Sequence, residues 1–146
     1  MDIYQYIIED HEKVDALFSK ILAAKGANRK LKLFEELKLE LLTHADSEHK
    51  TLYKTLKKHE NIKDKIAHAD KEHADVKKRL KELSRLSMQE ATWMEKLQEL
   101  KEVVEHHVKE EEEDIFTQAK QVLNEEKAID LTESMIDSKL KYLAHG

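Results

Sequence analysis

The chain has 146 residues, which is enough for one domain with a single buried core. It has no cysteine, which excludes disulfides and thiolate chemistry, and with no proline and two glycines it lacks the turn residues of a sheet-rich fold. Charged residues make up 39% of the chain, and the net charge of −5 with neutral histidines makes nucleic acid a poor partner.

Apolar residues recur at helical spacing from the start of the chain, and they predict a first helix over residues 3–21. This helix should stop near Lys25, because Gly26 can adopt the left-handed backbone that often follows a helix end. Asn28 is the expected N-cap of a second helix over residues 31–56, and Asn61 that of a third over residues 62–83.

The start of the fourth helix is ambiguous, since Ser87 and Thr92 each open a capping-box pattern. We place a loop near residues 87–91, start the helix at Thr92 and continue it to Val122. Asn124 should end it and cap a fifth helix over residues 129–143, which packs across one end or side of the others. The prediction is an all-α fold, an antiparallel up-down-up-down four-helix bundle with an additional C-terminal helix, forming one domain over residues 1–146.

The first twenty residues already carry charges, for example Asp2, Glu9 and Lys13, so they do not resemble a secretory signal. No apolar run approaches the length of a bilayer span. We therefore expect a cytoplasmic protein with no membrane partner.

Each apolar stripe is interrupted near its centre by polar residues on the same helix face. In chain order these residues are His11, His44, Glu48, His73, His107 and Glu111. Residues three and four apart share a helix face, so the six side chains should point inward with their apolar neighbours.

The four histidines among them are expected at one height in the bundle. With turns placed at residues 27, 60 and 89, the histidines lie 13 to 18 residues from the turns beside them. At about 1.5 Å per residue these offsets agree within roughly one helical turn. A fourth helix starting at Ser87 would separate His73 from His107 by roughly 12 Å, which is one reason for preferring Thr92.

Four imidazoles and two carboxylates in one core layer need a cation, because a bare buried carboxylate would protonate or destabilise the fold. This mixture of ligands suits iron, manganese or zinc, and six ligands exceed the four that one tetrahedral zinc takes. Two i,i+4 pairs, His44 with Glu48 and His107 with Glu111, could each supply a carboxylate shared between two ions.

The remaining histidines are assigned to the surface. His106 and Glu110 form a rival i,i+4 pair, but it lies about 100° around the helix from the inner face. His49 and His68 are the two that could supply a further ligand.

Taken together, four polar segments resemble the hemerythrin-like family, the HHE cation-binding domains. The segments are residues 10–12, 44–53, 72–75 and 107–116, and the resemblance covers roughly residues 3–143. It implies a four-helix bundle that holds a non-haem di-iron centre, oxo- or hydroxo-bridged, with zinc or manganese as alternative metals. The implied terminal nitrogen ligands are His11, His44, His73 and His107, and the implied bridging carboxylates are Glu48 and Glu111.

One position departs from the pattern of the oxygen-carrying hemerythrins. Those proteins use a fifth histidine four residues after the one in the third helix, where this chain has Lys77. The departure argues against reversible oxygen carriage, and the pattern is closer to relatives tied to iron-sulfur repair, nitric-oxide response or iron sensing.

We therefore expect a metal-binding protein that takes a small ligand such as O2, NO or peroxide at an open coordination position, and not primarily an enzyme. An enzyme that uses the same centre, with peroxidase-like or nitric-oxide-reducing activity, has no support beyond the metal ligands. A helical interaction module, metal-free or stabilised by metal but without redox chemistry, is the third interpretation.

Overall fold

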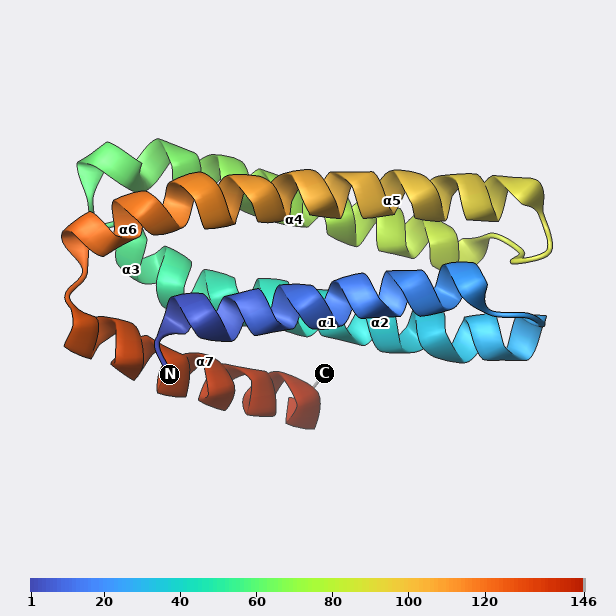
Figure 1. Cartoon of the computed structure of the whole chain (residues 1–146), viewed down its shortest axis with the longest axis horizontal. Coiled ribbons are helices and arrows are strands. Elements are labelled where there is room, and N and C mark those ends of the chain that lie inside the picture. The colour runs from blue at the N-terminus through green and yellow to red at the C-terminus, as the bar shows by residue number, and fades with distance from the viewer. Residues whose placement is uncertain (146) are drawn as a thin grey trace.

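The structure is a computed structural model that describes residues 1–145, and within that range it contains helices and no strand. Four long helices run alternately in opposite directions (Figure 1). They are α1 (Ile3–Ala23), α2 (Ala27–Glu48), α4 (Glu60–Arg85) and α5 (Ala91–Glu110). The predicted up-down-up-down bundle is confirmed.

Two of these helices continue through a single π-helical turn. After α2 come the π turn η1 (His49–Tyr53) and the short α3 (Lys54–Leu56), and after α5 come η2 (Glu111–Ile115) and α6 (Phe116–Val122). The predicted second and fourth helices therefore have the expected extent, but each changes its winding at its His-x-x-x-Glu pair.

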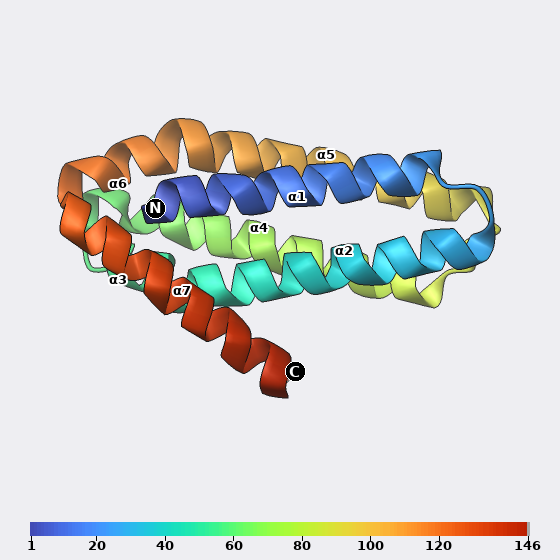
Figure 2. The ribbon, with the colours of Figure 1, turned by 60° about the horizontal axis from the view of Figure 1, so that its bottom comes forward.

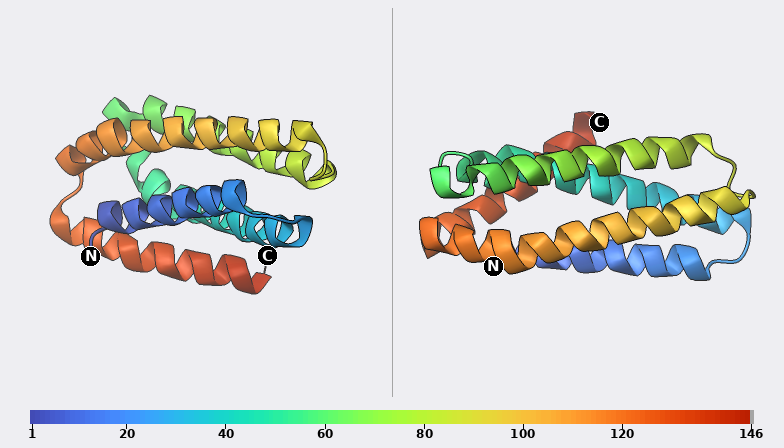
Figure 3. Two further views of the ribbon diagram at one scale, coloured as in Figure 1. Left: turned by 45° about the vertical axis from the view of Figure 1, so that its right-hand side comes forward. Right: turned by 90° about the horizontal axis from the view of Figure 1, so that it is seen from above.

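The additional C-terminal helix is α7 (Glu125–His145), and it packs against α1, α2 and η1. It crosses that side of the bundle obliquely, as Figure 2 and both views in Figure 3 show. The side chain of Asn124 accepts a hydrogen bond from the backbone N–H of Lys127 at 2.8 Å, so the predicted cap is confirmed.

Three other predicted helix starts are shifted by short distances. Gly26 has the expected positive φ of 88°, but it serves as the N-cap of α2, so the assignment of Asn28 as that cap was wrong. The assignment of Asn61 as the N-cap of α4 was also wrong, because α4 begins at Glu60 and its N-cap is His59. The fourth helix begins at Ala91, one residue before Thr92 and well after Ser87.

A polar layer divides the apolar core into two clusters. Along α1, Ile7 belongs to the cluster near the chain termini and Val14 to the other, with the buried His11 between them. Along α4, Ala69 and Val76 lie on either side of His73 in the same way. The interruptions in the apolar stripes therefore coincide at one level of the bundle.

In the described part of the chain, none of the helices combines the length and apolar character that crossing a bilayer requires.

Trp93 connects the two ends of the loop between α4 and α5. Its fully buried ring meets Phe34 edge-on at 5.5 Å, and its indole N–H donates to the carbonyl of Leu83 at 3.1 Å. That carbonyl belongs to the last turn of α4, where no further helical N–H can reach it.

Replacement of Trp93 by Phe should lower the free energy of unfolding of the metal-free protein by about 1–3 kcal/mol, because it removes a buried hydrogen bond and ring volume. Urea unfolding followed by circular dichroism measures this. Glu95→Gln, an exposed change on the same helix, is the matched control and should have no measurable effect. Equal stability of Trp93→Phe and wild type would contradict the role of this contact.

Candidate metal centre

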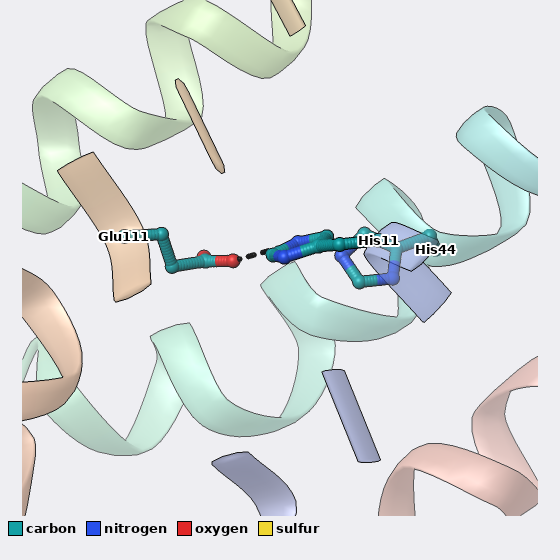
Figure 4. Close-up of side chains that lie close together, drawn as sticks. All are labelled: His11, His44 and Glu111. Atoms are coloured by element: carbon teal, nitrogen blue, oxygen red, sulfur yellow. Dashed lines mark ion pairs between the residues drawn. The ribbon is translucent and has the colours of Figure 1, made fainter. Parts of the chain in front are cut away.

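The six interrupting side chains come from α1, α2, α4, α5 and the first residue of η2, and they meet in the polar layer. They form two groups, each with ligand atoms within 4.8 Å of one another. The groups are His11, His44 and Glu111, and Glu48, His73 and His107. Figure 4 shows the first group, with His11 and His44 facing the carboxylate of Glu111.

Glu48 belongs to the second group but also reaches the first. Its Oε1 lies 3.2 Å from Nε2 of His73, and its Oε2 lies 3.4 Å from Nε2 of His44. The two oxygens of one carboxylate therefore face histidines of different groups.

Glu111 makes the reciprocal connection. Its Oε1 lies 3.1 Å from Nε2 of His11, and its Oε2 lies 3.9 Å from Nε2 of His107. Both carboxylates thus span the two groups, which is the arrangement of a bridging ligand between two ions.

The donor set fits metal ions better than it fits a closed hydrogen-bond network. Both Glu48 and Glu111 have 0% of their surface exposed. Buried atoms here without a hydrogen-bond partner are both oxygens of Glu48, Oε1 of Glu111, Nε2 of His44 and Nδ1 of His73. Buried polar atoms are normally satisfied, so such a concentration of nitrogen and oxygen atoms is typical of residues that bind a cation.

In three of the four histidines, a carboxylate contacts Nδ1, the ring nitrogen that faces away from the centre. Nδ1 of His44 lies 2.8 Å from Asp10, Nδ1 of His11 lies 2.6 Å from Glu112, and Nδ1 of His107 lies 2.8 Å from Glu72. In each case a proton on Nδ1 satisfies the carboxylate and leaves the Nε2 lone pair free toward the centre. This tautomer is the one that a metal ligand requires.

Two imidazole nitrogens of the second group lie so close together that a positive charge between them would stabilise the arrangement. Nε2 of His73 and Nε2 of His107 are 3.0 Å apart, and Glu72 fixes the proton of His107 on its other nitrogen. Two imidazole lone pairs at that distance repel each other unless a proton or a metal ion lies between them.

Charges in this layer shift the pKa values strongly when no metal is bound. Burial lowers the pKa of His44, but the charges of Glu48 and Asp10 outweigh burial and raise it to about 10. Burial raises the pKa of Glu48, but the neighbouring imidazoles, above all that of His44, hold it well below its usual value. A proton on His44 therefore takes the place of a cation in the metal-free protein.

Tyr53 is a further contact of the centre. Its buried hydroxyl donates to Oε2 of Glu111, and its ring stacks on His73 at 5.4 Å between centroids and 11° between planes. Burial and the charges of Glu111 and Glu48 raise the pKa of Tyr53 well above its usual value, so the phenol keeps its proton.

The π turns explain why Tyr53 faces this layer. It lies five residues after Glu48, which is about 1.4 turns of a regular α-helix and would place it off the inner face. The i→i+5 winding of η1 adds one residue to the turn and brings it back. Phe116 follows Glu111 at the same spacing through η2 and is also buried.

The alternative histidines lie away from the two groups. His106 pairs with Glu110 at 2.9 Å and is 66% exposed, so the inner pair is His107 with Glu111 as predicted. His49 is exposed and bonds Asp70, and His68 forms a separate surface group with Glu72 and Glu110. Neither of these two belongs to the groups that contain the six predicted ligands.

Sequence reasoning missed the partners behind the histidines. Asp10, Glu72 and Glu112 each immediately adjoin a predicted ligand, at position 11, 73 or 111, but the stripe pattern assigns such neighbours to other faces. Lys139 of α7, which contacts Asp10, carries no signal at all in the sequence. The stripe pattern also does not show that the hydroxyl of Tyr53 reaches Glu111.

The model of the hemerythrin HHE cation binding domain matches residues 2–119. A crystal structure of a hemerythrin HHE cation binding domain-containing protein from Mycobacterium kansasii is similar to this one, with 28% sequence identity and a TM-score of 0.85. The similarity covers 97% of this chain and 87% of that one. No curated protein matches the chain in a sequence search. From the family match, the fold and the His/Glu groups, the chain belongs to the hemerythrin HHE cation-binding domain family.

Proposed function

We propose that this protein holds a non-haem di-iron centre that binds a small ligand such as O2, NO or peroxide, with a role in oxygen or nitric-oxide sensing, iron handling or the response to iron-sulfur damage. The proposed ligands are His11, His44, Glu48, His73, His107 and Glu111. The observation that carries the proposal is that Glu48 and Glu111 each face two histidines, one from each group. A single ion would not need two carboxylates with this arrangement.

When bound, the iron pair would supply redox capacity and an open coordination position. The chain itself supplies a dry layer between two apolar clusters, carboxylates that fix the imidazoles, and a phenol that keeps a proton at Oε2 of Glu111. Lys77 cannot complete the coordination while it is charged, which leaves a position free beside His73.

A cleft gives a small molecule a way to that position. It has a volume of about 420 Å³ and lies where α2, α4 and α7 meet; its lining includes Leu41, His73, Val76 and Lys77. A diatomic molecule or peroxide is far smaller than this volume, so the cleft favours ligand access from the His73 side.

Metal loading tests the centre itself. We expect two iron ions per chain after expression in iron-replete medium, measured by elemental analysis, and Glu111→Gln should reduce this number because an amide is a poorer bridging ligand than a carboxylate. Glu113→Gln, an exposed change two residues away, is the matched control and should keep two. Colourless wild-type protein without iron would contradict the proposal.

The double variant with His44→Leu and His107→Leu separates this proposal from a metal-free interaction module. If the protein is a metal-free module, the two leucines should leave the free energy of unfolding unchanged or raise it. In a metal centre, wild type should gain about 2.7 kcal/mol in free energy of unfolding at a metal concentration 100 times the Kd, and the double variant should gain nothing. Thermal unfolding with and without metal measures both.

The raised pKa of His44 predicts opposite pH trends for the two states of the protein. Protonated His44 stabilises the metal-free fold fully below its unfolded pKa of about 6.5, and this contribution disappears as the pH rises toward about 10. Metal must displace that proton, so metal affinity should rise over the same interval. The melting temperature of metal-free protein should therefore fall from pH 6.5 to 8.5 while the metal-induced increase grows. His106→Gln should leave both trends unchanged, and a flat metal-induced increase would contradict the role of His44.

Exposure of the reduced protein to one ligand at a time tests the proposed partner. The absorption spectrum of the dithionite-reduced, iron-loaded protein should change on addition of NO, O2 or peroxide, and Lys77→His should alter that change because an imidazole can occupy the free position. Turnover of peroxide or NO, measured in the same samples, separates an enzyme from a binding protein. An iron-loaded protein whose spectrum responds to none of the three would contradict the proposal.

A further inference from the structure

The C-terminal helix α7 reaches the polar layer through one side chain. Lys139 has only 15% of its side chain exposed, although it is charged and its helix lies on the outside of the bundle. Its ammonium contacts Oδ2 of Asp10 and lies 4.5 Å from the centre of the Tyr6 ring. The family match ends at residue 119, before this helix begins.

A chain of contacts leads from Lys139 into the centre. The oxygen of Asp10 that Lys139 contacts is also the one 2.8 Å from Nδ1 of His44. On its other side, Nε2 of His44 faces Glu48 at 3.4 Å and lies in the group with His11 and Glu111. Lys139 is therefore two contacts away from His44, a proposed metal ligand.

Asp10 differs from the other carboxylates that hold histidines. Its side chain is 6% exposed, whereas Glu72 is 15% exposed and Glu112 is 30% exposed. The other two can complete their hydrogen bonding with water, but a carboxylate as enclosed as Asp10 needs a second polar partner inside the protein. Lys139 is that partner.

We propose that Lys139 is a positioning residue of the metal centre, which makes α7 a functional part of the site. By making a second contact with Oδ2 of Asp10, Lys139 keeps that oxygen against Nδ1 of His44 and so directs Nε2 toward the position of the metal. This inference rests on the proposed two-metal centre. Without Lys139, the side chain of Asp10 turns toward water, and His44 loses its orientation. We call the ligands around each proposed ion a half-site. Metal binding at the half-site of His11 and His44 then weakens, while the half-site of His73 and His107 is unaffected because Glu72 still holds His107.

The test is a Co2+ titration of the metal-free protein, followed by d–d absorption. Wild type should bind two ions per chain. Lys139→Met, which keeps the length but not the charge, should bind one ion as wild type does and the other about 10–100-fold more weakly, with an altered spectrum for the weak ion. Lys139→Arg should restore the wild-type titration, and Lys141→Met, an exposed lysine on the same helix, is the matched control.

A purely structural role in docking α7 is tested by Met135→Ala. Met135 is a fully buried residue of α7 that belongs to the apolar cluster near the N-terminus, so this variant should lower thermal stability without separating the two binding steps. Equal weakening of one Co2+ site by Met135→Ala and Lys139→Met would overturn the inference. So would a Lys139→Met protein that binds both ions as wild type does, while wild type binding no Co2+ would overturn the two-metal centre itself.

Discussion

The structure depends on two carboxylates, Glu48 and Glu111, placed where no water reaches them. An ionised carboxylate moved out of water loses several kcal/mol of hydration, even after the protein relaxes around it. Here each charge is surrounded by imidazoles from different helices, so the compensation exists only when α1, α2, α4 and α5 are all in register. The polar layer therefore fixes how the helices slide against one another, which two apolar clusters alone would leave loosely determined.

The π turns are a second consequence of that layer. Each begins at the end of a His-x-x-x-Glu pair. The turn η1 begins at the residue after Glu48, and η2 begins at Glu111 itself. The extra residue turns two successive apolar side chains inward, Leu52 with Tyr53 and Ile115 with Phe116, so the core closes tightly against the carboxylates. For Tyr53 the gain is also chemical, because its hydroxyl reaches Glu111. Winding that weakens a helix locally is retained here because it completes the surroundings of a buried charge.

The sequence predicted the level of the site because helical rise is uniform. Counting residues from each turn placed the four histidines in one layer without any knowledge of how the helices pack, and the structure has them there. The same uniformity cannot reveal a π turn, which differs from an α turn by one residue. Asn28 and Asn61 were wrong as caps because each lies within the first turn of its helix, where Gly26 and His59 already provide the non-helical residue.

Contacts between distant elements lie outside what periodicity can determine. Lys139 and Asp10 are 129 residues apart, and their meeting depends on the angle at which α7 crosses the bundle. Nothing in the apolar stripe of α7 specifies that angle, so a lysine on it looks like any solvated charge.

In the proposed centre, the difference between the two half-sites must come from their surroundings, since each has two histidines and shares the same two carboxylates. His11 and His44 are both held from behind, one by Glu112 and the other by Asp10 with Lys139. On the other side Nδ1 of His73 has no partner, and the same histidine lines the cleft that also contains Lys77. A ligand atom that enters through this cleft meets the less constrained half-site first, where an imidazole can move to accommodate it. His11 and His44 would then hold a metal ion in the more rigid half-site, and His73 would supply the half-site that can adjust to a ligand.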